Sequence, residues 1–194
     1  MDTHSALLIV DLQNDFCPGG SLAVPEGDTI VPVVNHAIGR FSAPGLPIIA
    51  SRDWHPARTS HFRDFGGIWP PHCIQGTVGA KFHPDLHLPQ ETIIVSKGTD
   101  PHRDDYSALQ ARDDLGTPLS ELLTRLGVTH IYVCGLATDY CIKETVLEAR
   151  LCGIGVTVLT DAVRGVDLAP GDSERALEMM CAAGAKSATT ADLQ

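Results

Sequence analysis

Short runs of apolar residues alternate along the chain with longer segments whose apolar positions recur at helical spacing. The runs are rich in Val, Ile and Leu and predict strands at 6–10, 47–51, 92–96, 130–134, 155–159 and, more weakly, 186–189. The segments between them predict helices at about 28–42, 117–126, 139–152 and 172–183. Apolar strands separated by helices are typical of a parallel sheet that is covered on both faces. The pattern therefore predicts the α/β class, as a three-layer α/β/α domain with a mostly parallel six-stranded sheet.

Two stretches depart from this rhythm. Residues 53–90 carry Pro, Gly and Trp together with five of the nine His, and residues 98–116 are polar and rich in Asp. Loops of this length inside a compact domain are usually functional. We therefore expect one domain over 1–194 with a functional loop insertion at about 53–90. The last helix, in "GDSERALEMMCAAG", is expected to have Asp172 or Ser173 as its N-cap and to stop at Gly184.

The charge balance excludes two classes of partner. The 14 Lys and Arg against 24 Asp and Glu give a net charge of −10 that is spread along the chain. Nucleic acid and anionic membranes both attract basic surfaces, so neither is expected as a partner. The apolar run near the N-terminus, "ALLIV", is too short for a signal peptide or a transmembrane helix. The expected location is the cytoplasm. Small α/β hydrolases often self-associate, and the sequence leaves a homo-oligomer open.

The six Cys, at 17, 73, 134, 141, 152 and 181, are too irregularly placed for a disulfide scaffold. In a reducing compartment they would be free thiols. Cys134 and Cys181 lie inside apolar patterns and fit buried small hydrophobes. Cys141 taken alone also favours packing, so its role depends on its surroundings.

Chemically useful side chains follow four successive strands. Asp11 follows the first strand, Asp53 and His55 the second, Lys97 the third, and the loop to Cys141 the fourth. In an open parallel sheet, ligands bind beyond the carboxyl ends of the strands, where such loops converge. Each residue alone has a plain explanation, as a turn residue or a surface charge, but four such coincidences in a row indicate a site.

The set suits a thiol nucleophile. A free thiol has a pKa of about 8.5, so little of it is thiolate at neutral pH. Lys97 would supply a nearby cation and Asp11 a base. With Thr138 or Asp139 as N-cap, Cys141 would lie in a first helical turn, whose amides and dipole favour a thiolate and an oxyanion. This is the equipment of an acyl-transfer site.

A second cluster lies in "RDWHPARTSHFRDFGGIWPPHC". Asp53 and His55, at i and i+2, project the same way from an extended segment. His61 and His72 follow in the same loop. A single His in a loop is usually a surface residue, but this combination favours a divalent metal, with Zn first and Fe or Mn as alternatives. The sequence contains no Cys-x-x-Cys motif, which argues against a closed structural zinc site.

Taken together, these segments resemble the nicotinamidase branch of the isochorismatase-like cysteine hydrolases over nearly the whole chain. The matching segments are "LLIVDLQNDFCPGGSLAV", "SRDWHP", "WPPHCIQGTVGAKFHPDL", "VSKGTD" and "VCGLATDYCIKETVLEA". The resemblance implies an amidohydrolase acting on a linear carboxamide, which converts nicotinamide to nicotinate and ammonia in NAD salvage, with pyrazinamide as a second substrate. It implies a thioester on Cys141, with Asp11 as acid and base and Lys97 supporting the ionised pair.

The resemblance also implies roles for the surrounding residues. The amides of Ala137 and Cys141 would hold the oxyanion, and the Leu136-Ala137 bond would be a non-proline cis peptide. The metal would be held by Asp53, His55 and His72 and would bind the pyridine nitrogen. His61 matches a fourth ligand of some members, with Asp64 as a substitute. The residues expected to line the substrate pocket are Phe16, Leu22, Trp69, Tyr106, Leu136 and Ala137.

Three other functions compete with this one. A related amidohydrolase acting on a carbamoyl or ureido compound would keep Asp11, Lys97 and Cys141 but would not need the metal set. An isochorismatase would not need the cysteine. A catalytically silent metal-binding or interaction protein on the same fold would not need the complete triad.

Overall fold

The computed structural model describes residues 1–193, and its sheet is parallel throughout. The strand order is β3-β2-β1-β4-β5-β6. The strands are β1 Ser5–Val10, β2 Ile48–Asp53, β3 Ile93–Lys97, β4 His130–Leu136, β5 Gly155–Arg164 and β6 Lys186–Ala188. The α-helices are α1 Val31–Ser42, α2 Leu119–Arg125, α3 Lys143–Leu151 and α4 Asp172–Ala182. The predicted α/β/α class and the six strands are confirmed, and the sheet is fully rather than mostly parallel.

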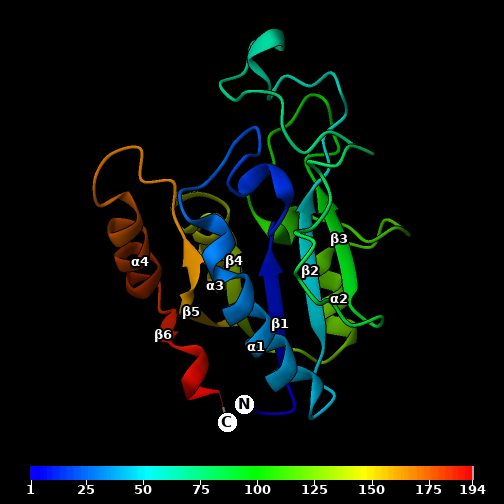
Figure 1. Ribbon diagram of the computed structural model, residues 1–194. Coiled ribbons are helices and arrows are strands. Elements are labelled where there is room, and N and C mark those ends of the chain that lie inside the picture. Colours follow the sequence, from blue (N-terminus) through cyan, green and yellow to red (C-terminus); the bar gives the residue numbers. More distant parts are fainter. Residues whose placement is uncertain (194) are drawn as a thin grey trace.

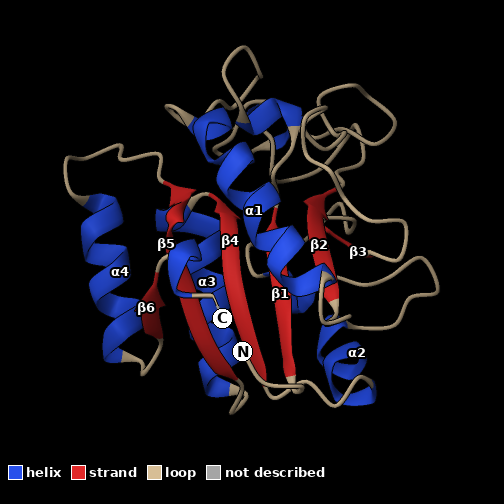
Figure 2. Ribbon diagram, turned by 60° about the horizontal axis from the view of Figure 1, so that its bottom comes forward, coloured by secondary structure: helices blue, strands red, loops and turns tan. Residues whose placement is uncertain are grey.

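The helices form two layers around the sheet. Apolar residues of α1 pack with Leu7 and Ile9 on one face, while those of α2, α3 and α4 pack with Leu8 and Val10 on the other. Figures 1 and 2 show α1 on one side of the strands with α2 and α3 on the opposite side. Every residue of β1 is buried. This is why the strand reads as one continuous apolar run rather than as alternating positions.

Several strands run farther than their apolar residues alone predict. β2 continues to Asp53 and β3 to Lys97, and these two residues are paired across the strands. Backbone pairing with a neighbour extends a strand past its last apolar residue, and this is what brings the two side chains together. Asp53 and Lys97, which were expected to follow their strands, are therefore the last residues of those strands.

The helix starts also differ from the predictions. The helix expected from residue 28 begins as a 3-10 turn, Gly27–Ile30, and α1 starts at Val31 with Pro32 in its first turn, where the missing amide costs least. The N-cap of α4 is Gly171, not Asp172 or Ser173. The Asp172 carboxylate accepts the Ala169 amide and the Ser173 hydroxyl donates to Asp167, so both side chains are engaged in the preceding loop. Asp172 and Glu174 fall in the first helical turn, where acidic side chains interact favourably with the helix dipole.

From β1 the chain first adds β2 and β3 on one side of the sheet and then adds β4, β5 and β6 on the other side, so the order of the strands reverses at β1. A crevice forms at the carboxyl ends of the strands at such a switch point. In Figure 1 the segment between β2 and β3 rises above this end of the sheet, far from the N-terminus. Within residues 1–193, no helix has the length and apolar character needed to cross a membrane.

Candidate active site

Asp11, Lys97 and Cys141, which we call the acid–base cluster, meet at the switch point. Lys97 Nζ lies 2.9 Å from Asp11 Oδ2 and 3.4 Å from Cys141 Sγ. It also pairs with Oδ1 of Asp53, from the neighbouring strand. Asp11 and Lys97 are at most 1% exposed and Cys141 is 8% exposed. The three predicted residues are thus brought into direct contact, away from bulk water.

The charges of this cluster depend on one another. Burial by itself would lower the pKa of Lys97, but the carboxylates of Asp11 and Asp53 raise it well above its ordinary value, so the ammonium stays charged. Burial raises the pKa of Asp11, and Lys97 opposes that shift. Ser51 also donates to Asp11 Oδ1 at 2.7 Å, which favours the ionised carboxylate.

The resting state of Cys141 differs from the expected thiolate. Burial raises the pKa of the Cys141 thiol well above its ordinary value; Lys97 opposes this, and the Asp11 and Asp53 carboxylates add to it. The expectation counted the groups that favour a thiolate and left out the cost of burying its charge. Cys141 therefore rests as a thiol beside Asp11, and its proton has to be moved when the nucleophile is needed.

The turn that carries Cys141 begins with a cis bond between Leu136 and Ala137, as the resemblance implies. The following residues, Thr138–Ile142, form a π-helical turn whose N-cap is Ala137, and the amides of Tyr140 and Ile142 both donate to the Ala137 carbonyl. The predicted N-caps, Thr138 and Asp139, are therefore wrong.

Asp139 has a different task. Its two carboxylate oxygens accept the amides of Val166 and Asp167 at 2.9 and 2.8 Å, so it cannot cap the turn. These bonds hold the loop after β5 against the turn that carries Cys141. Val166 from that loop then lines the pocket.

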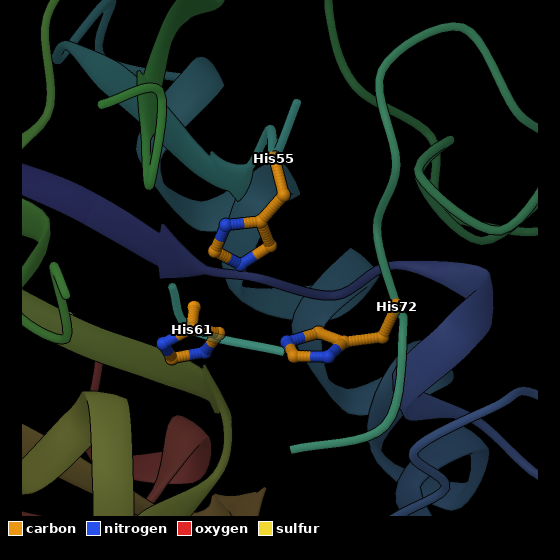
Figure 3. Close-up of side chains that lie close together, drawn as sticks. All are labelled: His55, His61 and His72. Carbon is orange, nitrogen blue, oxygen red and sulfur yellow. The ribbon is translucent and has the colours of Figure 1, made fainter. Parts of the chain in front are cut away.

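His55, His61 and His72, which we call the histidine cluster, lie beside Asp53. One nitrogen from each ring lies within 4.8 Å of the others, and all three residues are buried. Figure 3 shows the three rings turned toward a common space. Asp53 Oδ2 is 3.6 Å from His55 Nε2 and 3.8 Å from His72 Nε2. Asp53 thus faces the histidine cluster with one oxygen and Lys97 with the other.

Each ring is held through its Nδ1 atom. Nδ1 of His55 bonds to the Gly98 carbonyl at 3.0 Å, and Nδ1 of His72 to the Pro70 carbonyl at 2.7 Å. Carbonyl oxygens only accept, so Nδ1 is the donor, and in the neutral form of such a ring the lone pair lies on Nε2. Gly98 has φ +66°, and a Cβ there would lie 2.4 Å from the His55 ring, so glycine is required at this contact.

The cluster fits a divalent metal. His55 Nε2 is buried and has no hydrogen-bond partner among the described residues. Burial lowers the pKa of His72 to about 4 and also lowers that of His61, so both rings are neutral, which is the metal-binding form. A buried, unpartnered imidazole nitrogen beside a carboxylate is a costly arrangement that a metal ion would satisfy.

The structure separates the two candidates for the fourth ligand. His61 belongs to the cluster, and its Nδ1 lies 2.8 Å from Asp104 Oδ1. Asp64 is exposed in the 3-10 turn Arg63–Phe65 and is not part of the cluster. Asp64 therefore does not replace His61 in this structure.

A pocket opens beside both clusters. Each of the residues expected at the substrate lines it: Phe16, Leu22, Trp69, Tyr106, Leu136 and Ala137. Trp69 Nε1 donates to the Tyr106 hydroxyl at 2.8 Å, and the Trp69 ring meets the Tyr140 ring edge to face, 5.2 Å between centroids. The walls are thus mainly aromatic and apolar, with Asp53, His61, His72 and Cys141 among the polar groups.

Sequence reasoning missed several pocket residues, namely Val24, Asp105, Tyr140 and Val166. Tyr140 had a usable signal, because it immediately precedes Cys141. Gln13 was missed as well: its side chain accepts from the Asp53 amide and donates to the Asp53 carbonyl, both within 2.8 Å, so it fixes the position of Asp53. Its place two residues after Asp11 was the available hint.

Comparison with known proteins decides the family. The model of the isochorismatase domain matches residues 5–192. The chain belongs to the isochorismatase family. Within this family it is similar to a nicotinamidase of Escherichia coli strain K12, with 44% identity over 96% of this chain and 95% of the relative.

Solved structures of family members agree with the fold. A pyrazinamidase of Pyrococcus horikoshii in complex with zinc is 46% identical, with a TM-score of 0.89 over 96% of this chain and 99% of that one. A protein called PnC1 from L. infantum, in complex with nicotinate, is 34% identical, with a TM-score of 0.87 over 99% of this chain and 96% of that one. These isochorismatase-family relatives resemble the chain over its length, not only at the motifs.

Proposed function

We propose that this protein is a nicotinamidase, which hydrolyses nicotinamide to nicotinate and ammonia. The observation that carries the proposal is the placement of the acid–base cluster and the histidine cluster on one aromatic pocket, joined by Asp53. The similar Escherichia coli protein is a nicotinamidase, the similar Pyrococcus horikoshii structure is a pyrazinamidase, and the similar PnC1 structure is in complex with nicotinate. The carbamoyl or ureido alternative is not favoured, since it offers no reason for the three imidazoles.

The first half of the reaction forms a thioester. Asp11 takes the proton of the Cys141 thiol, and Sγ bonds to the carboxamide carbon of the substrate. Lys97, 3.4 Å from Sγ, stabilises the negative charge while it is on sulfur. The carbonyl oxygen becomes an oxyanion, for which the amides of Ala137 and Cys141 are the proposed donors. When the intermediate collapses, the carbon–nitrogen bond breaks, Asp11 returns the proton to nitrogen, and ammonia leaves.

The second half releases the acid. A water molecule gives its proton to Asp11 and adds to the thioester carbon. The carbon–sulfur bond then breaks, the Cys141 thiolate regains a proton from Asp11, and the acid leaves the pocket and gives its remaining proton to solvent to become nicotinate. Ser51 and Lys97 hold the carboxylate of Asp11 in place through both halves, because each contacts a different oxygen.

Asp53, His55, His61 and His72 would hold a divalent metal, for which zinc is the proposed identity and iron or manganese the alternatives. When bound, the ion would offer a coordination position to the ring nitrogen of the substrate. Phe16 and Trp69 would contact the faces of the ring, and Leu22, Tyr106 and Leu136 would close the pocket around it.

Pyrazinamide is the proposed second substrate, because it carries the same carboxamide beside a ring nitrogen. All six cysteines are free thiols, which supports action in the reducing cytoplasm, in NAD salvage. A homo-oligomer stays an expectation from the size of the protein.

A single assay tests the proposal. Purified, metal-loaded protein is mixed with nicotinamide, with pyrazinamide or with a carbamoyl compound, and ammonia release is followed. We expect rapid release from the first two and little from the third. Release from the carbamoyl compound alone would support the competing amidohydrolase and would rule out the proposal.

A further inference from the structure

The three rings of the histidine cluster are oriented by unlike acceptors. His55 and His72 are held by backbone carbonyls, whereas His61 is held by the side-chain carboxylate of Asp104. Asp104 lies 43 residues from His61, in the polar segment that follows β3. One of the three rings thus depends on a side chain from another part of the chain, and that side chain carries a charge.

We propose that Asp104 is a positioning residue for the metal and acts through His61, whose Nδ1 lies 2.8 Å from the Asp104 carboxylate. The inference rests on the proposed function only in placing a metal at the histidine cluster. An ionised carboxylate can only accept, so the proton of the His61 ring lies on Nδ1 and the lone pair on Nε2. The bond also fixes the rotation of the ring, which is stacked on His55 at 4.7 Å between centroids and 20° between planes.

The charge of Asp104 adds to this effect. A carboxylate behind a ligating imidazole raises the basicity of the nitrogen that faces the metal, and removing such a partner typically costs about 10- to 100-fold in metal affinity. Carbonyls behind His55 and His72 orient their rings without this full charge. Asp104 therefore affects both the basicity of the His61 nitrogen that faces the metal and the orientation of the His61 ring.

The segment that carries Asp104 is anchored independently of this bond. The Ser60 amide donates to the Pro101 carbonyl at 2.8 Å, and Tyr106 accepts from Trp69. The Asp104 side chain is 47% exposed, so its loss opens no buried cavity. Removing the carboxylate should leave the loop in place and release only the His61 ring.

The test measures zinc affinity of the full-length, metal-stripped protein by competition with a chromogenic chelator. We expect Asp104→Ala to bind zinc about 10- to 100-fold more weakly than the unaltered protein. Asp104→Asn should lose less, because its amide oxygen still accepts the Nδ1 proton. Asp64→Ala, which removes the exposed carboxylate three residues after His61, is the matched control and should bind zinc as the unaltered protein does. The unfolding midpoint of each metal-free variant should be unchanged.

A double-mutant comparison separates positioning from general charge. If Asp104 acts through His61, then His61→Ala and the double variant His61→Ala, Asp104→Ala should bind zinc with the same affinity. The inference is overturned if Asp104→Ala binds zinc normally, if the two losses add, or if the unaltered protein binds no zinc. A protein that shows the predicted zinc affinities but releases no ammonia from nicotinamide would refute the proposed function and leave this inference standing.

Discussion

Two members of the acid–base cluster, Asp11 and Lys97, lie at strand ends of the sheet, whereas most of the histidine cluster lies on the loop above the sheet. Lys97 is the last residue of β3 and pairs with Asp53, and Asp11 directly follows β1, where its amide donates to the Ser51 carbonyl of β2, so backbone contacts within the sheet fix both. His61 and His72 come from the long segment between β2 and β3, and hydrogen bonds to other loop residues orient their rings. The same pocket is thus built in two ways, from paired backbone and from loop contacts.

Asp53 joins the two clusters. It ends β2, pairs with Lys97 through one oxygen and faces His55 and His72 through the other. The difference between the clusters predicts that changes on the sheet side damage the chemical step and the stability of the fold. Changes on the loop side should damage metal and substrate binding and leave the fold nearly intact.

The largest expected effect is that of Cys141→Ala. Losing the nucleophile should lower kcat by at least about 10⁴-fold, while zinc affinity stays close to that of the unaltered protein. Steady-state ammonia release and a chelator competition check the two halves of this statement. Cys152→Ala, which removes an exposed thiol, is the control and should keep full activity.

Lys97→Met tests the sheet side for stability. It leaves the carboxylates of Asp11 and Asp53 buried without their cation, which typically costs about 3 to 5 kcal/mol. Urea unfolding of the metal-free protein measures the loss, and activity should be abolished as well. Lys186→Ala, at an exposed position, provides the comparison. A free energy of unfolding unchanged by Lys97→Met would break the contrast between the two clusters.

His72→Ala tests the loop side. It should lower zinc affinity and kcat/KM for nicotinamide by about 100-fold, with a free energy of unfolding of the metal-free protein that differs little from that of the unaltered chain. Chelation of the unaltered protein should reproduce the loss of activity, and added zinc should reverse it. His87→Ala, at an exposed position, should do neither. Full activity of the metal-free protein would show that the reaction does not need the metal.

The smallest effect is expected from Ser51→Ala. The Ser51 hydrogen bond lowers the pKa of Asp11, which burial raises, so its loss should raise that pKa further. Asp11 has to be ionised to accept the thiol proton, and activity therefore falls as the pH drops through its pKa. The acid limb of the kcat/KM profile should move to higher pH in the variant, with about a tenfold loss near neutral pH. An unmoved acid limb would assign the limb to another group.

The sheet side could be predicted from the sequence because strand ends converge in a known way. Apolar runs locate the strands, and Asp11, Lys97 and Cys141 then follow from their positions. The loop side was predictable only by residue type, since His61 and His72 resemble ligands without revealing their geometry. Asp104 and Asp139 were not assigned these tasks because their partners lie 43 and 27 residues away, and such contacts exist only in the folded chain.

Local capping preferences also gave the wrong N-cap for the turn that carries Cys141. Thr138 and Asp139 have good capping side chains, yet the Asp139 carboxylate binds the loop after β5, and Ala137 begins the turn. The resting thiol was missed for a related reason, since the degree of burial of Cys141 cannot be read from its neighbours in sequence.

The central claim is that Cys141 forms a thioester with the substrate. The most direct test mixes the enzyme with nicotinamide, quenches the reaction in acid within its first turnover, and examines the peptides by mass spectrometry. The account predicts a nicotinoyl group on the peptide that contains Cys141, absent from Cys141→Ala and gone after turnover is complete. Rapid ammonia release with no such adduct, and with unchanged activity in Cys141→Ala, would contradict it.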